Sequence, residues 1–227
     1  MNIIQTWKDN NIPKQYIPFV NSVREHTKNW NYLFFNDKDI DNFFKLKATN
    51  YLAVYNSLPY KIQRIDFFRY VAIYYYGGVY LDLDILLEES IDELFKEPHI
   101  CKFPIELDNI KDTIITQNNF YKLIGNYAFY APAKHPFIKQ IIDNITNKRL
   151  NLNDVNIAAS TNNDPYTDVF VYCTTGPIMV TQSYIDFIDN DSNKINNKKS
   201  VELIIPEPFT PNSFGRFGTH CCYGSWK

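Results

Sequence analysis

The sequence is poor in glycine. Only seven of its 227 residues are glycines, and it contains no G-x-x-x-x-G-K-[ST] loop. A phosphorylated ligand would therefore find no glycine-rich loop whose backbone amides could surround its phosphates. If the substrate carries phosphate groups, a metal ion has to neutralise the negative charge that develops on them.

The sequence also lacks an excess of charge of either sign. It has 23 basic and 25 acidic side chains, with a formal net charge of -2. A protein that binds nucleic acid through its backbone needs a basic surface. The balance of charge therefore indicates no nucleic acid partner.

Long hydrophobic runs are absent too. No stretch approaches the roughly 18 uninterrupted apolar residues of a membrane span, and the most apolar region, residues 65–87, contains four charged side chains. The first residues, MNIIQTWKDNNIPK, have no basic start followed by an apolar segment, so they do not resemble a signal peptide. We expect a cytoplasmic protein without a transmembrane segment; peripheral membrane association stays open.

What the chain does contain is hydrophobic residues, at 45% of the total, in alternating strand-like and helix-like segments. This alternation predicts an α/β fold with a mostly parallel central sheet flanked by helices, within one domain over residues 1–227. Asp37 or Asp39 is expected to cap the second helix. Strands are expected at residues 3–7, 30–35, 79–87, 121–130 and 203–205, helices at 19–28, 39–47, 60–76, 136–148 and 177–188, and a polar surface loop at 189–200.

The stretch GGVYLDLDIL, residues 77–86, places two carboxylates in a run that looks like a buried strand. Since strand side chains alternate between faces, Asp82 and Asp84 are expected on one face with Tyr80, about 7 Å apart. They come late in the strand, and ligand clefts in open α/β sheets lie beyond the carboxyl ends of strands. The pair predicts a site for Mn²⁺ or Mg²⁺, which oxygen ligands favour. Solvation at a sheet edge, or pairing with an arginine, is the alternative.

The helix before this stretch carries three charged residues, Arg64, Asp66 and Arg69. Asp66 and Arg69 are three positions apart, and therefore neighbours on one helix face. They interrupt an otherwise apolar helix that ends close to the two aspartates. They are either a structural ion pair or a polar clamp that fixes the hydroxyl groups of a ligand.

The run R-x-D-x-x-R-Y-(x)5-Y-G-G-V-Y-L-D-L-D, from Arg64 to Asp84, resembles the sugar-binding region of glycosyltransferase family 32. That family includes fungal α-mannosyltransferases and bacterial capsule enzymes, and it is similar to the catalytic domains of glucosylating toxins. The resemblance implies a GT-A fold and a metal-dependent, retaining transfer of a hexose from a UDP- or GDP-sugar to a glycan, lipid or protein acceptor. It also places Arg64, Asp66, Arg69 and Tyr80 among the substrate-binding residues.

Shorter matches follow in the order of the same family. The family's opening H-Q-T-W is kept here as Gln5-Thr6-Trp7, without the His, and the resemblance places these three residues at the donor, with Trp7 near the nucleotide base. GNYAFYAPAKHPF, residues 125–137, resembles a segment in which an Asn lies beside the donor sugar, and this Asn corresponds to Asn126. TTGP at residues 174–177 matches a family turn.

The tail H-C-C-Y-G-S-W resembles the family's H-x-x-x-G-S-W, a segment that closes over the diphosphate. The resemblance makes His220 a nitrogen ligand of the metal, and it makes Ser225 and Trp226 contacts of the β-phosphate. Asp84 is expected to bind the metal directly, while Asp82 bridges the ribose and the metal. No side chain stands out as a general base, and the amide of Asn126 is too weak to be a nucleophile.

Two other functions fit parts of the same pattern. Phosphatases of the haloacid dehalogenase type also place D-x-D after an apolar strand, but they expect Thr or Val at the position of Leu86 and a later G-D, which this chain lacks. A non-catalytic protein that binds a carbohydrate or nucleotide sugar could keep the fold and most of the site. Release of nucleotide from a donor separates an enzyme from such a binder.

Overall fold

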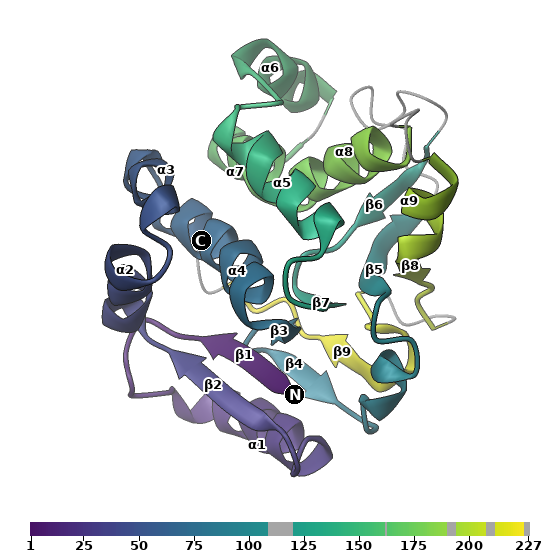
Figure 1. Ribbon diagram of the computed structural model, residues 1–227. Helices are drawn as coiled ribbons and strands as arrows, with labels where there is room; N and C mark the ends of the chain where they lie inside the picture. Colours follow the sequence, from purple (N-terminus) through teal and green to yellow (C-terminus); the bar gives the residue numbers. More distant parts are fainter. Residues whose placement is uncertain (109–119, 162, 190–193, 208–211, 225–227) are drawn as a thin grey trace.

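The computed structural model describes residues 1–108, 120–161, 163–189, 194–207 and 212–224 (Figure 1). The strands are β1 (Asn2–Thr6), β2 (Asn31–Phe35), β3 (Gly78–Leu81), β4 (Ile85–Leu87), β5 (Cys101–Asp108), β6 (Lys122–Ile124), β7 (Ala128–Ala131), β8 (Val201–Ile204) and β9 (Gly218–His220). The α-helices are α1 (Ile17–His26), α2 (Asp37–Leu46), α3 (Leu52–Ser57), α4 (Lys61–Tyr76), α5 (Pro136–Thr146), α6 (Leu152–Thr161), α7 (Tyr166–Thr174), α8 (Pro177–Ile188) and α9 (Lys194–Ser200).

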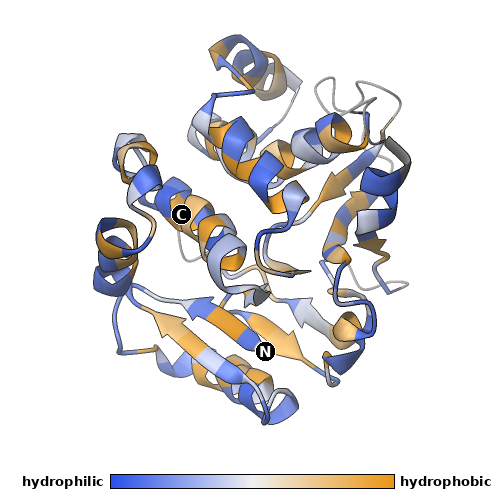
Figure 2. Cartoon of the chain, viewed as in Figure 1, coloured by the Kyte–Doolittle hydropathy of each residue, from blue (hydrophilic) through white to orange (hydrophobic). Residues whose placement is uncertain are grey.

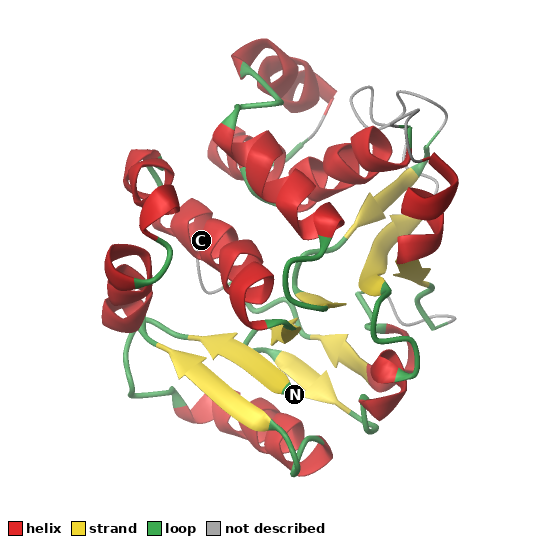
Figure 3. Cartoon of the chain, in the orientation of Figure 1, coloured by secondary structure: helices red, strands yellow, loops and turns green. Residues whose placement is uncertain are grey.

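A seven-stranded sheet runs through the centre of the part of the chain described above. Its order is β2-β1-β3-β7-β5-β6, and β8 pairs with β5 outside this path. The pairs β1–β2, β1–β3 and β5–β8 are parallel, whereas β7 is antiparallel to both β3 and β5, and β6 is antiparallel to β5. Helices lie around this sheet (Figure 3), which confirms the expected α/β class.

The two faces of the sheet belong to different hydrophobic clusters because neighbouring strand residues alternate. Ile4 and Tyr80 pack into the larger cluster, which contains helices α4, α5 and α8. Ile3, Val79 and Leu81 face the opposite way, into a second cluster with β4 and the C-terminal segment. Figure 2 shows the apolar residues on the inner strands and on the sides of the helices that face them.

Helix α4 is the central element of the larger cluster. Nine of the eleven residues from Gln63 to Ile73 are buried, on nearly all sides of the helix, so its apolar residues do not form a single stripe. Gly77 ends the helix in a left-handed conformation (φ 62°), as the sequence predicts. At Gly78 (φ 113°) an added Cβ would lie 2.2 Å from the carbonyl oxygen of Asn2, so only glycine lets β3 lie against β1 there.

The predicted continuous strand over residues 79–87 is wrong. β3 stops at Leu81, the chain turns through Asp82–Asp84, and β4 begins at Ile85. The turn is closed by a hydrogen bond from the Ile85 N–H to the Asp82 carbonyl oxygen. The strand breaks because β4 leaves the main sheet and pairs with β9 in a separate two-stranded sheet. Leu83, expected to face the same way as Val79, therefore packs in a third cluster with Tyr16.

Other predicted boundaries also change. The strand expected over residues 121–130 is two strands, β6 and β7, separated by Gly125-Asn126-Tyr127. Asn36 caps α2, and Asp39 returns the bond as the third residue of a capping box. Of the polar loop expected over residues 189–200, Lys194–Ser200 is helix α9, and residues 190–193 lie outside the described residues.

The described residues contain no helix that is both long and apolar enough to cross a membrane.

Candidate active site

A cavity of about 480 Å³ opens at the carboxyl ends of β1 and β3. Its position agrees with the rule that ligand clefts of α/β sheets lie beyond the ends of the strands. The sheet, helix α4, helix α7 and the C-terminal segment all contribute to its walls. The polar lining residues used below are Thr6, Asp66, Arg69, Asp82, Asp84, Glu106, Asn126 and His220.

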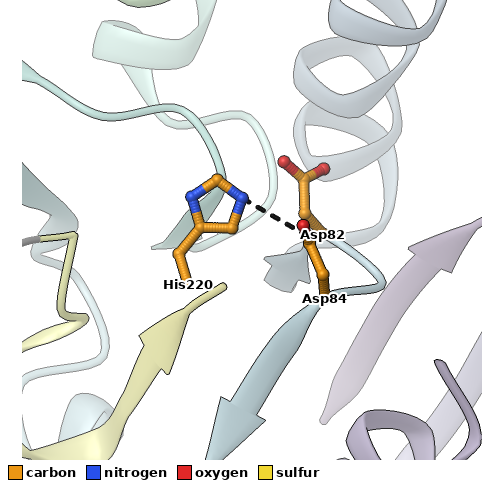
Figure 4. A group of neighbouring side chains, drawn as sticks. All are labelled: Asp82, Asp84 and His220. Carbon is orange, nitrogen blue, oxygen red and sulfur yellow. Dashed lines mark ion pairs between the residues drawn. The ribbon is translucent and has the colours of Figure 1, made fainter. Parts of the chain in front are cut away.

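Asp82, Asp84 and His220 meet at one corner of this cavity (Figure 4). One ligand atom from each residue lies within 4.8 Å of the others. The two aspartates come from the turn after β3, and His220 comes from β9, which pairs with β4 so that His220 lies opposite Ile85. The structure therefore brings together the three residues that the sequence analysis assigns to the metal, although two of them lie on a turn and not on a strand.

Asp84 and His220 form an ion pair, with His220 Nε2 3.3 Å from Asp84 Oδ1. The other carboxylate oxygen accepts a hydrogen bond from the backbone N–H of Tyr223. Burial acts to raise the pKa of Asp84, but the bonds from His220 and Tyr223 outweigh it and the pKa is lowered. Burial acts to lower the pKa of His220, but the bonds to Asp84 and Cys222 raise it to about 10. The ring also stacks on Tyr127 at 4.5 Å.

Asp82 is held by the protein itself. Tyr80 donates a hydrogen bond of 2.8 Å to Asp82 Oδ1, and Arg69 Nη2 lies 3.3 Å from the same oxygen. The side chain of Gln5 donates to the Asp82 carbonyl oxygen at 3.2 Å. Burial raises the pKa of Asp82, and the positive charge of Arg69 opposes that rise. The arginine pairing considered as an alternative therefore holds for Asp82, while Asp84 pairs with a histidine.

Arg69 also connects the metal corner to a second group of polar residues. Its Nη2 lies 3.1 Å from Asp66 Oδ1, and its Nη1 donates to the Asn126 carbonyl oxygen at 2.7 Å. Thr175 donates to Asp66 Oδ2, and the Asn126 side-chain amide donates to Asp66 Oδ1 and to the Tyr70 hydroxyl. Nearly all of these groups are buried, so the network fixes the backbone and side chain of Asn126 at the cavity wall.

Asp66 and Asn126 keep atoms available for a ligand. Burial raises the pKa of Asp66 to about 6, and its contact with Arg69 limits that rise. Asn126 donates from its amide nitrogen, and no donor reaches its Oδ1 from the described residues. Since both residues line the cavity, they can accept hydrogen bonds from hydroxyl groups there.

The wall formed by the end of β1 is aromatic. Trp7 lies at 4.9 Å from Tyr16, centroid to centroid, and both line the cavity. The indole N–H of Trp7 is buried and has no acceptor among the described residues. An aromatic pair with an unused donor suits a flat heterocycle such as a nucleotide base.

The remaining site residues expected from the sequence lie behind the cavity or outside the described residues. Gln5 and Tyr80 are fully buried and hold Asp82 in place by donating hydrogen bonds to it. Arg64 donates to the Leu58 carbonyl oxygen and is not part of the cavity wall. Ser225 and Trp226 lie outside the described residues.

Sequence reasoning missed several residues of the site. Thr175 and Tyr70 hold Asp66 and Asn126, and Thr175 lies in the TTGP turn that the analysis noted without giving it a role. Glu106 lines the cavity from β5, in a segment without a readable motif. No local signal marks Glu106, because its position depends on the pairing of β5 with distant strands.

The metal corner fits a divalent cation in its chemistry. Two carboxylates supply oxygen donors of the kind that bind Mn²⁺ and Mg²⁺ in proteins, and one imidazole supplies a nitrogen donor. Asp84 and His220 have their ligand atoms directed at each other, and an ion between them would replace the proton of His220.

The comparisons with known proteins agree with this fold and site. Residues 1–100 match the family described as "Glycosyltransferase sugar-binding region containing DXD motif", and this span includes Asp82 and Asp84. The solved structure described as "PaToxG Glycosyltransferase" aligns over 87% of this chain and 73% of its own length, with a TM-score of 0.51 and 15% identity. This protein therefore shares the GT-A fold of that structure, and residues 1–100 are similar to DXD-type sugar-binding regions.

Curated relatives are fungal mannosyltransferases. "Inositol phosphoceramide mannosyltransferase 1" of Schizosaccharomyces pombe is 34% identical over 147 residues, which are 63% of this chain and 42% of that protein. "Mannosyl phosphorylinositol ceramide synthase CSH1" of Saccharomyces cerevisiae is 28% identical over 149 residues, or 66% of this chain and 36% of that protein. The alignment thus spans less than half the length of these relatives. The resemblance to glycosyltransferases that the sequence predicts is confirmed.

Proposed function

We propose that this protein transfers a hexose from a nucleotide-diphosphate sugar to a hydroxyl group of a glycan, lipid or protein acceptor. The observation that supports this most directly is the meeting of Asp82, Asp84 and His220 beside Arg69, Asp66 and Asn126 in one cavity. The first three residues offer ligands for a cation on the diphosphate, and the second three offer partners for sugar hydroxyls. We propose that one GT-A domain, residues 1–227, carries both functions.

Each part of the cavity has a role in this proposal. Trp7 and Tyr16 cover the nucleotide base, and Asp84 and His220 hold Mn²⁺ or Mg²⁺. The bound cation would stabilise the negative charge on the leaving diphosphate, a contribution of several kcal/mol in comparable sites. Asp82 stays anchored by Arg69 and Tyr80, so it supports the cation and the ribose from a fixed position.

The donor sugar lies against Asp66, Arg69 and Asn126 in this arrangement. The Nη atoms of Arg69 contact two aspartates and a carbonyl oxygen, so Arg69 orients Asp66, while its Nε is buried without an acceptor among the described residues. Asp66 accepts hydrogen bonds from sugar hydroxyls, and the Oδ1 of Asn126 faces the anomeric carbon. A rigid, water-poor wall of this kind positions the sugar for transfer.

Mannose is the first donor sugar to test, because the relatives named above are mannosyltransferases. The test measures the thermal midpoint of unfolding with UDP- and GDP-hexoses, with and without Mn²⁺, and then the release of nucleotide. We expect donor and Mn²⁺ to raise the midpoint together, by mass action. Asp84→Asn should lose the part of this rise in the thermal midpoint that depends on Mn²⁺. The control variant Asp143→Asn alters an exposed pair with Lys139 on α5 and should keep it.

The outcomes separate the candidate functions. Stabilisation by a donor without release of nucleotide would indicate a binding protein and not an enzyme. A phosphatase of the haloacid dehalogenase type would need Asp82 as a free nucleophile, but Tyr80 and Arg69 occupy its oxygens. If no donor stabilises the folded protein with Mn²⁺ present, the proposal fails.

A further inference from the structure

Glu106 enters the cavity because β5 is irregular at that position. β5 pairs with β6 through Ile105 and Ile124, and then through Leu107 and Leu123, with a shift of register between the two pairs. A shift of this kind is a β-bulge, which redirects the side chain of the extra residue. Glu106 is that residue, and its side chain lines the cavity while Leu107 is exposed.

The carboxylate of Glu106 has no partner to justify its position. Among the described residues, no hydrogen bond or ion pair reaches it, although it is partly buried in the wall of the cavity. Burial raises the pKa of Glu106 to about 7, and the charge of His220 limits that rise. A carboxylate that is desolvated without a donor is costly to the folded protein. A ligand with hydroxyl groups would satisfy it.

Glu106 lies on the side of the cavity away from the aromatic wall. In the sheet order, β5 is separated from β1, which precedes Trp7, by β3 and β7 (Figure 1). The residues Asp82, Asp84 and His220 can share a cation, and Glu106 is not among them, although it feels the charges of His220 and Asp82. A second negative charge beyond the cation would repel a diphosphate. If the base lies at Trp7, the diphosphate at the cation and the donor sugar at Asp66 and Asn126, the wall at Glu106 is left for the acceptor.

The cavity that Glu106 lines also offers surface for a ring with hydroxyl groups. Val171, Tyr172 and Pro177 line the same cavity and provide apolar and aromatic surface. The faces of sugar and cyclitol rings pack on such surface, while a carboxylate accepts hydrogen bonds from hydroxyl groups at their edges.

We propose that Glu106 binds a hydroxyl group of the acceptor, and that the acceptor presents a polyhydroxylated ring, either a sugar or a cyclitol. This inference rests on the proposed function, since it assumes that the base, diphosphate and sugar of the donor fill the other parts of the cavity. Glu106 fixes the ring of the acceptor by a hydrogen bond and makes no contact with the donor.

The test compares the full-length wild type with Glu106→Gln, using Mn²⁺ and the sugar nucleotide that the wild type hydrolyses fastest. Two reactions are measured, transfer to water and transfer to methyl α-D-mannopyranoside or myo-inositol. We expect the wild type to transfer the sugar to at least one of these probes faster than to water, after both rates are divided by the concentration of hydroxyl groups. We expect Glu106→Gln to lose at least about tenfold in transfer to the probe and less than about twofold in hydrolysis.

Three results would overturn the inference: no preference for either probe in the wild type, unchanged transfer in Glu106→Gln, or an equal loss in both reactions. The last would place Glu106 at the donor. Asp108→Asn is the matched control, because Asp108 follows two residues later on β5 and pairs with exposed Lys122. Glu106→Gln should keep or raise the thermal midpoint at pH 8, since it removes a partly buried charge without a partner among the described residues, so misfolding is detected separately.

Failure of the proposed function gives a different result. If the wild type hydrolyses no sugar nucleotide, the transferase proposal fails before Glu106 is tested by turnover. Saturation-transfer NMR of the same two probes then tests Glu106 by itself, with Mn²⁺ and either UDP or GDP present. Binding that the wild type shows and Glu106→Gln loses supports the inference, and equal signals or no signal in both proteins contradict it.

Discussion

His220 and Asp84 face each other because β9 pairs with β4. His220 lies opposite Ile85 in that pair, so its ring reaches the carboxylate of the preceding residue, with 3.3 Å between Nε2 and Oδ1. The two residues are 136 positions apart in the sequence, and the contact joins the turn after β3 to the C-terminal segment. The metal corner therefore depends on a small sheet that is separate from the main one.

The ion pair predicts that metal binding depends on pH. In the metal-free protein the pKa of His220 is about 10, so the imidazole carries a proton at neutral pH. A metal ligand must be unprotonated, so Mn²⁺ has to displace that proton. The affinity of the wild type for Mn²⁺ should rise about tenfold per pH unit between about pH 6.5 and 8.5.

Isothermal titration calorimetry over this pH range checks the expectation, and buffers of different ionisation enthalpy count the proton released. His220→Asn removes the titrating group, so that variant should bind Mn²⁺ more weakly and with little dependence on pH. An affinity of the wild type that stays constant across the range would show that His220 is not a ligand.

Stability without metal should fall at alkaline pH. The folded-state pKa of His220 lies above the ordinary value of 6.5, so the folded protein holds the proton more tightly than the unfolded chain. The contribution of the pair to stability is complete below about pH 6.5 and disappears as the pH rises towards 10. Asp84 has a lowered pKa, so its contribution is lost only on the acid side.

Urea unfolding of the wild type and of His220→Asn in EDTA measures this effect. The difference in free energy of unfolding between the two proteins should be larger at pH 6.5 than at pH 9.5. A difference that grows with pH would contradict the assigned direction of the His220 shift.

Arg69 should matter far more to stability than an exposed arginine. It is 3% exposed and contacts two carboxylates and the Asn126 carbonyl oxygen. Arg69→Leu leaves the buried Asp66 and the partly buried Asp82 without a cation, and breaking a buried pair costs about 3–5 kcal/mol of unfolding free energy in comparable cases. Arg149→Leu removes a more exposed pair with Asp186 and should cost less than about 1 kcal/mol.

Chemical denaturation at pH 7.5 compares the two variants. Arg69→Leu combined with Asp82→Asn should recover part of the loss, because it removes one of the uncompensated charges. Equal losses in the two single variants would show that the buried network contributes no more than a surface pair.

The sequence was sufficient for the parts of the fold that depend on local pattern. Helix α4 and its end at Gly77 follow from apolar spacing and from glycine chemistry, and both are confirmed. The break at Asp82 could not be predicted, because the apolar residues on both sides look like one strand. They belong to two sheets, and only the pairing of β4 with β9 makes this visible.

The functional site could also be predicted only in part from the sequence. Asp82, Asp84 and His220 were named from a motif and a resemblance, and the structure places them together. Asp82 and Asp84 do not lie on one strand face as predicted, yet the turn still brings their carboxylates to the same corner. No local motif marks Glu106, because a β-bulge and the pairing of β5 with β6 and β8 determine the direction of its side chain.

Gly218 should be required for the metal corner, although it lies two residues before His220. Its φ of 169° is ordinary extended backbone, so strain is not the reason. An added Cβ would lie 2.2 Å from the Leu86 carbonyl oxygen, on the neighbouring strand β4. Gly218→Ala must therefore push β9 away from β4 and move His220 away from Asp84.

We expect Gly218→Ala to weaken Mn²⁺ binding by at least about tenfold while the far-UV circular dichroism keeps its helical signal, because helix α4 and the main sheet do not include β9. Thr219→Ala is the matched control: Thr219 lies on the same strand opposite Leu86, and its substitution leaves room for the backbone pairing. If Gly218→Ala binds Mn²⁺ as tightly as Thr219→Ala does, then either β9 does not position His220 or His220 does not hold the cation. Measuring His220→Asn beside them decides between these two, since it removes the imidazole without altering the strand.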